Sequence, residues 1–292
     1  MHEAINNFRS VLACPVSGGN LSIEGDYLVS DSGCKYEVFE NVINFTGDLS
    51  TNYDKHWEKF ESSPLKVNRS ENFFKWSTQR INEDSSSINV LDLGCGDGNH
   101  TPLFNNFKYI AVDISKTIYD LASKHRESNN MIFLKADAFS LPIKNQSVDF
   151  IFSFAGVNYF PSYGEQSLNT LLGSLDKILS SKGYAALWGA GSKSKLSVFA
   201  FELYRKIYKK SPNSLKDIIL FIGCLSASII KNSSNINIFN SPIAHVKEIV
   251  STNLTPDYIN YFENNSWVDL APKDWLLIEE YDYYCGQLFQ KP

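Results

Sequence analysis

The chain has 292 residues, of which 43% are hydrophobic and 20% are charged, and its formal net charge is −5. This composition is typical of a globular protein, so it excludes a disordered or fibrous chain. The slight acidity argues against a dedicated nucleic-acid-binding protein, which normally carries a strong basic excess.

Cysteine usage and hydropathy indicate the expected environment. The five cysteines are an odd number and too few for a disulfide scaffold, so we expect a reducing, cytoplasmic location. Residues 1–15 lack a basic segment followed by a long apolar core, and no signal peptide is predicted. The longest apolar run, residues 218–230, is too short to span a bilayer.

The first 87 residues divide into two predicted parts. Residues 1–48 contain short strand-like segments between turn signals and predict a small β module of hairpins. Residues 50–82 carry aromatic side chains at helical spacing and predict helices, and the polar segment 83–87 reads as a linker.

From residue 88 onward, apolar strands alternate with helical segments. Strands are predicted at 88–93, 108–114, 131–136, 148–154 and 183–190, and the clearest helix at 165–180. Strands separated by helices imply right-handed crossovers and a mostly parallel sheet covered on both faces. Residues 193–250 are helical in pattern and locally basic, 254–265 predict another helix, and 266–290 predict two strands. The expected fold is therefore α/β, a Rossmann-like doubly wound sheet with an antiparallel C-terminal strand.

The sharpest motif is the glycine loop after the first of these strands. Gly94, Gly96 and Gly98 alternate there, and a helix is expected to begin at 99–101. The glycine spacing here is G-x-G-x-G, whereas the dinucleotide-binding fingerprint is G-x-G-x-x-G. Asp92, ahead of the glycines, suits a cationic ammonium better than a pyrophosphate, and Asp113 ends the second strand, where a carboxylate accepts ribose hydroxyls. The predicted ligand is a nucleoside with an amino-acid-like end.

Three segments, VLDLGCGDG (90–98), AVDIS (111–115) and KADAFSLPIKNQSVDFIFS (135–153), together resemble the motif series of class I S-adenosylmethionine-dependent methyltransferases. The resemblance extends over residues 50–292 and implies that S-adenosylmethionine is the cofactor and S-adenosylhomocysteine the product. It implies that Asp92 and Gly94 face the methionine part, and that Asp113 holds the ribose. The other implied cofactor-binding residues are Gly96, Gly98, Ile114 packing on the adenine, Asp137 and Ala138 bonding it, and Ser153 or Phe154 lining the methionine end.

Several of these residues also fit ordinary structural roles that involve no ligand. The glycine loop alone fits a plain tight turn, and Asp137 alone fits a solvated loop carboxylate. Cys95 is interpreted as a small turn residue and not as a nucleophile. Tyr53 and Trp57, one helical turn apart, form either an aromatic lid over the sulfonium, by cation–π contact, or ordinary helix packing.

Candidate catalytic residues come from three other segments. His56 belongs to the lid helix and His245 to the basic insertion, so each is a candidate general base. Asn158 and Tyr159 follow the fourth core strand and could orient an acceptor, although Tyr159 fits a wall residue equally well.

The N-terminal segment resembles the small zinc-ribbon module that precedes many bacterial methyltransferases. The resemblance rests on Cys14-Pro15 and on Cys34, but Ser17 stands where the family has a second cysteine and the second pair has only Cys34. Two thiols do not complete a four-ligand zinc site, so a degenerate, metal-free ribbon is expected. The alternative, two core cysteines in an ordinary β module, also predicts that no zinc is bound.

These observations predict three parts: a β module at 1–48, a helical lid and linker at 49–87, and a methyltransferase core at 88–292 with a helical cap at 193–250. The expected activity is methyl transfer to an oxygen or nitrogen atom of a small biosynthetic acceptor. The alternatives are a catalytically idle binding or scaffold protein and an RNA methyltransferase that would use the basic stretch 193–216. Nucleic acid is not the expected partner, and membrane-surface contact through 193–230 ranks below a cap.

Overall fold

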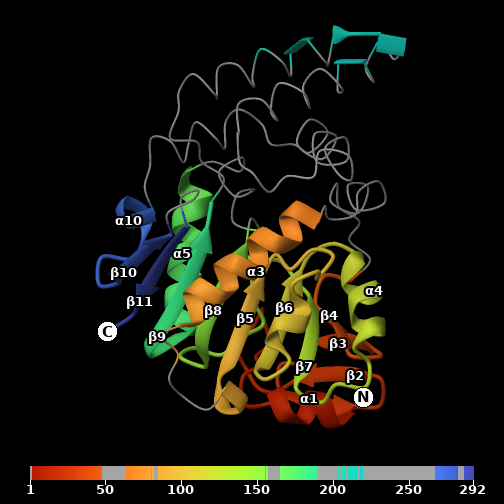
Figure 1. Ribbon diagram of the computed structural model, residues 1–292. Helices are drawn as coiled ribbons and strands as arrows, with labels where there is room; N and C mark the ends of the chain where they lie inside the picture. The colour runs from red at the N-terminus through yellow and green to blue at the C-terminus, as the bar shows by residue number, and fades with distance from the viewer. Residues whose placement is uncertain are drawn as a thin grey trace.

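The computed structural model describes residues 2–47, 64–79, 81, 85–154, 156, 165–189, single residues between 203 and 219, 267–281 and 286–292. Within these residues, the strands form one sheet in the order β1-β2-β3-β4-β7-β6-β5-β8-β9-β11-β10 (Figure 1). The stretch from β4 to β9 is parallel, and both ends of the sheet are antiparallel. The predicted α/β, mostly parallel fold is confirmed.

The N-terminal segment begins with a short helix, α1 (His2–Phe8), followed by β1 (Leu21–Glu24), β2 (Tyr27–Ser30), β3 (Lys35–Phe39) and β4 (Val42–Asn44). The four strands form an antiparallel meander, in line with the predicted hairpins. Its last strand then pairs in parallel with β7, which places Ile43 beside Leu134. The module therefore extends the central sheet across the boundary predicted at residue 48.

The parallel core contains β5 (Asn89–Leu93), β6 (Lys108–Asp113), β7 (Met131–Lys135), β8 (Val148–Phe154) and β9 (Leu179–Trp188). All five match the predicted apolar runs, although β9 begins four residues before the expected start. The C-terminal hairpin β10 (Leu276–Tyr281) and β11 (Gly286–Gln290) completes the edge, with β11 antiparallel to β9.

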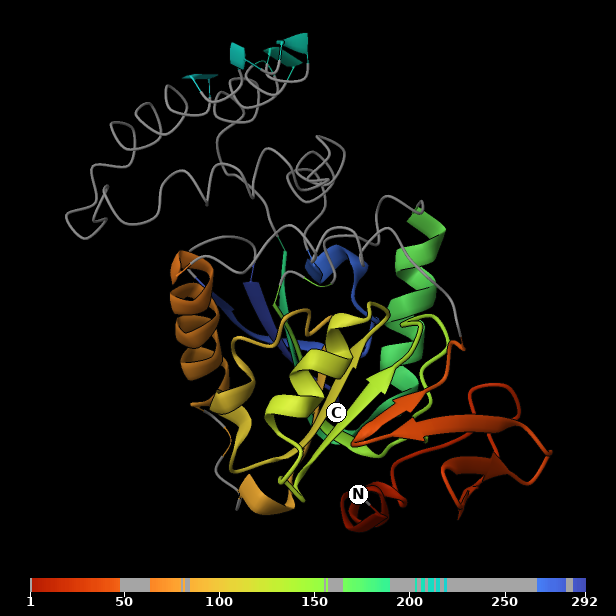
Figure 2. The ribbon, with the colours of Figure 1, turned by 90° about the vertical axis from the view of Figure 1, so that its right-hand side faces the viewer.

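Helices cover both faces of the sheet, as doubly wound folds require. One face carries α3 (Pro64–Thr78), the 3₁₀ helix η2 (Thr101–Phe104) and α4 (Thr117–Lys124), whose Phe73, Phe104 and Leu121 belong to one core cluster. The other face carries α1 and α5 (Glu165–Ile178), with Phe8 and Leu171 in a second cluster. Figure 2 shows α3 and α5 on opposite sides of the sheet. Short helices η1 (Ser85–Ser87) and α10 (Trp267–Leu270) precede β5 and β10.

The expected helix after the glycine loop is reduced to the single 3₁₀ turn of η2. Pro102 occupies its first turn, and β6 begins only four residues after η2 ends, so there is no room for a longer helix. The strand order reverses between β5 and β8, because the chain continues from β5 toward β6 and β7 and later returns to the other side of β5. Ligands of open α/β sheets bind at this reversal, outside the carboxyl ends of the strands.

The insertion after β9 is described only at scattered helical residues. Leu203, Ile207, Leu215 and Ile218 are each about half exposed there, and Lys206 and Lys210 are exposed as well. No helix among the described residues is long and apolar enough to cross a membrane.

Candidate cofactor site

The glycine loop after β5 is held in a conformation that suits glycine. Gly94, Gly96 and Gly98 have φ angles of +74°, +59° and +65°. A Cβ atom built on Gly94 would lie 2.7 Å from the Cα atom of Gly156, in the loop after β8. The two loops therefore approach each other backbone to backbone, and the missing side chain is a steric requirement. The amide of Gly94 donates to the carbonyl of Val112 at 2.8 Å, which ties the loop to the end of β6.

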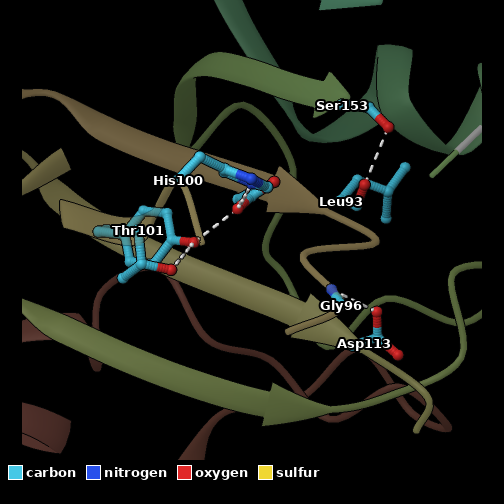
Figure 3. A network of polar contacts seen from close by, with 8 residues as sticks. Leu93, Gly96, His100, Thr101, Asp113 and Ser153 are labelled. Atoms are coloured by element: carbon cyan, nitrogen blue, oxygen red, sulfur yellow. Dashed lines mark hydrogen bonds and ion pairs between the residues drawn. The ribbon is translucent and has the colours of Figure 1, made fainter. Parts of the chain in front are cut away.

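Asp113, at the end of β6, connects the glycine loop to the next turn. Its Oδ2 accepts the amide of Gly96 at 2.8 Å, and its Oδ1 accepts the amide and hydroxyl of Ser115 at 2.8 and 2.6 Å (Figure 3). Burial raises the pKa of this carboxyl above its usual range, although these hydrogen bonds oppose that effect. Oδ2 accepts only one of these bonds, so it keeps capacity for a further donor.

Asp92, two residues before Gly94, belongs to a buried polar network. Its Oδ2 lies 2.8 Å from His100 Nε2 and accepts the Tyr109 hydroxyl at 2.5 Å, and that hydroxyl lies 3.1 Å from Thr101 Oγ1. The carboxylate is fully buried, and its Oδ1 has no hydrogen-bond partner among the described residues. The pairing of His100 and Tyr109 with Asp92 was not expected from the sequence. A tyrosine inside a largely buried strand was the available signal, because a buried hydroxyl needs a partner.

The predicted adenine contacts lie at the ends of β6 and β7. Ile114 and Ala138 are half-buried, and Asp137 accepts the amide of Phe139 at 3.0 Å through Oδ1. That bond closes a local turn, which is the usual behaviour of a loop aspartate. The structure thus places these residues at the same edge of the sheet as Asp113, and their role toward adenine stays a prediction.

Ser153 and Phe154 end β8 with different contacts. The Ser153 hydroxyl donates to the carbonyl of Leu93 at 2.8 Å, so it fastens β8 to the start of the glycine loop (Figure 3). Phe154 is buried, and its ring stacks on Trp188 with centroids 4.6 Å apart. Both side chains have structural partners in the fold, and their place along the methionine end stays a prediction.

Cys95 is fully enclosed within the glycine loop. Burial and the neighbouring carboxylates of Asp113 and Asp92 raise the pKa of its thiol well above the ordinary value. The thiol therefore stays protonated at neutral pH, and this agrees with its interpretation as a small turn residue instead of a nucleophile.

The two N-terminal cysteines, Cys14 and Cys34, both lie close to the hydroxyl of Tyr36. Cys14 Sγ lies 3.0 Å from the Tyr36 hydroxyl and accepts the amide of Ser17 at 3.4 Å, while Cys34 Sγ lies 3.6 Å from Ser32 Oγ. Burial raises the pKa of Cys14, but hydrogen bonds from Ser17, Tyr36 and backbone amides outweigh it and lower that pKa to about 6. Within the described residues, no three His, Cys, Asp or Glu side chains are arranged to hold a metal ion.

Six predicted residues lie outside the part of the chain that the structure describes: Tyr53, His56, Trp57, Asn158, Tyr159 and His245. The helix predicted at 254–265 lies outside it as well. Their roles stay predictions.

The described residues fit S-adenosylmethionine at the switch point. The loop around Gly94 and Gly98 has no room for side chains, since a Cβ on Gly98 would lie 2.3 Å from Leu121 Cδ1. Asp113 offers acceptor capacity at a strand end, and Asp92 carries a buried oxygen without a partner. An oxygen of this kind suits a cationic ammonium group, because an unpartnered buried carboxylate oxygen is costly.

Comparison with known proteins supports the same cofactor. Residues 91–187 match the family described as Methyltransferase domain. The demethylmenaquinone methyltransferase of Lactococcus lactis subsp. lactis is 24% identical over 202 residues, which cover 66% of this chain and 71% of the relative.

Two solved structures show likeness at low similarity. Phosphoethanolamine N-methyltransferase 1 of Haemonchus contortus, in complex with phosphoethanolamine and S-adenosylhomocysteine, has a TM-score of 0.40 and 19% identity, covering 48% of this chain and 31% of that one. A SAM-dependent methyltransferase from Aquifex aeolicus has a TM-score of 0.38 and 22% identity, covering 50% of this chain and 76% of that one.

The strand order, the glycine loop and Asp113 fit a protein that binds a nucleoside cofactor at the switch point of a parallel sheet. The family match across β5 to β9 supports an S-adenosylmethionine-dependent methyltransferase domain in this part of the chain. S-adenosylmethionine is its cofactor, and transfer of the methyl group leaves S-adenosylhomocysteine as the cofactor product.

Proposed function

We propose that this methyltransferase acts on an oxygen or nitrogen atom of a small-molecule acceptor in a biosynthetic reaction. The observation that supports the cofactor half of the proposal is the loop geometry, in which Asp113 holds the Gly96 amide and keeps acceptor capacity for the ribose. The formal net charge of −5 favours a small molecule over nucleic acid as the acceptor.

The bound cofactor supplies a methyl group on a positively charged sulfonium. The residues of the chain then have to bind and align the two reactants, and alignment alone accounts for much of the rate enhancement in such reactions. In this proposal, Asp92 takes the ammonium group, Asp113 takes the ribose hydroxyls and Asp137 takes the adenine amine. Ser153 keeps β8 fastened to the loop through Leu93, so that the strand ends stay in register.

A base is needed only where the acceptor carries a proton that must leave. His56, His245, Asn158 and Tyr159 stay the candidates for accepting that proton or for orienting the acceptor. Tyr53 and Trp57 stay the candidates for an aromatic lid over the sulfonium.

The insertion 193–250 is proposed as the cap that selects the acceptor. It follows β9, which runs parallel to β8 and ends at the same edge of the sheet, and the half-exposed Leu203, Ile207, Leu215 and Ile218 offer apolar surface. Replacing 193–250 with a short linker should abolish turnover and leave cofactor affinity nearly unchanged. Turnover at the original rate by the shortened chain would rule the cap out.

The test of the activity is production of S-adenosylhomocysteine with a panel of acceptors. The panel should contain phenols, amines, a small structured RNA, and demethylmenaquinone, because the Lactococcus relative is named for that acceptor. Turnover with a phenol or an amine supports the proposal. Turnover with the RNA alone supports the RNA alternative, and cofactor binding without turnover on any acceptor supports an idle binding protein.

A further inference from the structure

We propose that Tyr109 and His100 are positioning residues of the cofactor site, which hold Asp92 by one carboxylate oxygen and leave the other for the ammonium group of the cofactor. The inference rests on the proposed role of Asp92 at the methionine end. It adds two residues, one in β6 and one just before η2, that no motif of the sequence singles out for binding.

The arrangement of donors is the first argument. Tyr109 Oη at 2.5 Å and His100 Nε2 at 2.8 Å both contact Oδ2 of Asp92, and Oδ1 has no partner among the described residues. Two donors on the same oxygen fix the orientation of the carboxylate plane. They also neutralise part of its charge and leave the other oxygen without a donor among the described residues.

The rigidity of the donors is the second argument. The Tyr109 ring stacks on Phe104 with centroids 4.8 Å apart, and its hydroxyl lies 3.1 Å from Thr101 Oγ1. The His100 ring packs on Phe152 at 5.6 Å. The donors therefore come from β6 and from the turn before η2, and aromatic packing restricts both rings, as the support of a binding group requires.

The cost of the network is the third argument. A fully buried carboxylate with one unpartnered oxygen destabilises the ligand-free protein, and an apolar side chain at position 92 would avoid that cost. A purely structural network would be expected to satisfy both oxygens. Burial and the charge of Asp92 raise the pKa of Tyr109 well above its ordinary value, so its hydroxyl remains a donor at working pH.

The experiment compares two ligands that share adenine and ribose. S-adenosylhomocysteine carries the ammonium group, and 5′-methylthioadenosine lacks the whole amino-acid end. Calorimetry on Tyr109→Phe and His100→Asn should show S-adenosylhomocysteine weakened by on the order of ten-fold in each variant, because one charge-assisted hydrogen bond is lost. Affinity for 5′-methylthioadenosine, measured by competition, should stay within about two-fold of the wild-type value.

A double-mutant cycle shows whether Tyr109 acts through Asp92. In the Asp92→Asn background, adding Tyr109→Phe should no longer weaken S-adenosylhomocysteine. Ser180→Ala is the matched control. The Ser180 hydroxyl also donates to a carboxylate, Oδ1 of Asp149 at 3.0 Å, but this pair lies at the amino-terminal ends of β8 and β9. This control should change neither affinity.

Three outcomes would overturn the inference: equal weakening of both ligands, unchanged affinity for S-adenosylhomocysteine in Tyr109→Phe and His100→Asn, or a full effect of Tyr109→Phe in the Asp92→Asn background. Failure of the proposed cofactor site itself looks different, because the wild-type protein would then bind neither ligand.

Discussion

At the scale of single residues, the glycine loop depends on the contact between two backbones. A Cβ at position 94 would require φ of +74° and a 2.7 Å approach to Gly156. Gly94→Ala should therefore lower the free energy of unfolding by at least about 2 kcal/mol, from left-handed strain and the backbone clash together. Urea unfolding of the variant measures this loss.

Gly173→Ala is the natural control for that variant. Gly173 is exposed in α5, and a Cβ added there would meet nothing within 4 Å, so alanine should raise stability by about 0.5–1 kcal/mol. Equal effects of the two substitutions would show that the approach of Gly94 to Gly156 is not needed for the fold.

The position of the glycine loop and of the strand-end carboxylate beside it was predictable from sequence, because glycines and strand-end carboxylates leave a local signature. That carboxylate is Asp113, at the end of β6. The pairing of Asp92 with Tyr109 was not predictable in the same way, since Tyr109 lies in an apolar run that reads only as a buried strand. The contact depends on β6 lying in register beside β5, which places Tyr109 next to Val90.

At the scale of elements, the N-terminal module lowers the pKa of Cys14, the first cysteine of the segment that resembles a zinc ribbon. Cys14 has a pKa lowered to about 6 from the ordinary 9.0. A lowered pKa adds stability that is complete above about pH 9 and is lost as the pH falls toward 6. The difference in unfolding free energy between wild type and Cys14→Ser should grow from pH 6 to pH 9, by on the order of 2 kcal/mol.

The hydroxyl of Ser17 supplies one of the hydrogen bonds that lower this pKa. Ser17→Ala should raise the pKa of Cys14, and the ultraviolet absorbance of the thiolate would follow the titration directly. A stability difference between wild type and Cys14→Ser that stays constant from pH 6 to pH 9 would contradict the thiolate assignment.

Zinc content is a separate prediction for the same module. Ser17 stands where a ribbon would place a cysteine, and Tyr36 contacts Cys14 at 3.0 Å. The purified protein should therefore contain no stoichiometric zinc. Elemental analysis is the measurement, and one zinc per chain that disappears in Cys14→Ser would contradict it.

At the scale of the whole molecule, the sheet runs without interruption from the N-terminal module into the core. Lys135 at the end of β7 is buried, and its Nζ donates to Thr46 Oγ1 at 2.5 Å and to the carbonyl of Gly47 at 3.2 Å. This connection, with the pairing of β4 to β7, was not predictable from sequence, because parallel pairing between remote segments leaves no local pattern.

Removal of residues 1–47 should therefore affect the entire fold. It would expose the edge of β7 and delete Ile5, Phe8, Leu12 and Ile43 from the core cluster that they share with Ile132 and Leu134. Burial of four such side chains is worth on the order of 5 kcal/mol or more, close to the whole stability of a typical domain. The truncated chain should lose cooperative thermal unfolding or aggregate. An unchanged melting temperature in a monodisperse sample would instead identify residues 1–47 as an independent domain.

The measurement that tests the central claim most directly is calorimetric titration of the full chain with S-adenosylhomocysteine, beside its Asp113→Ala variant. We expect one site per wild-type chain and a loss of a few kcal/mol of binding free energy in the variant, because each ribose hydroxyl bonded to a charged acceptor contributes about 1.5–3 kcal/mol. The absence of binding to the wild type, or equal affinities for the two proteins, would contradict the cofactor site described at the ends of β5 and β6.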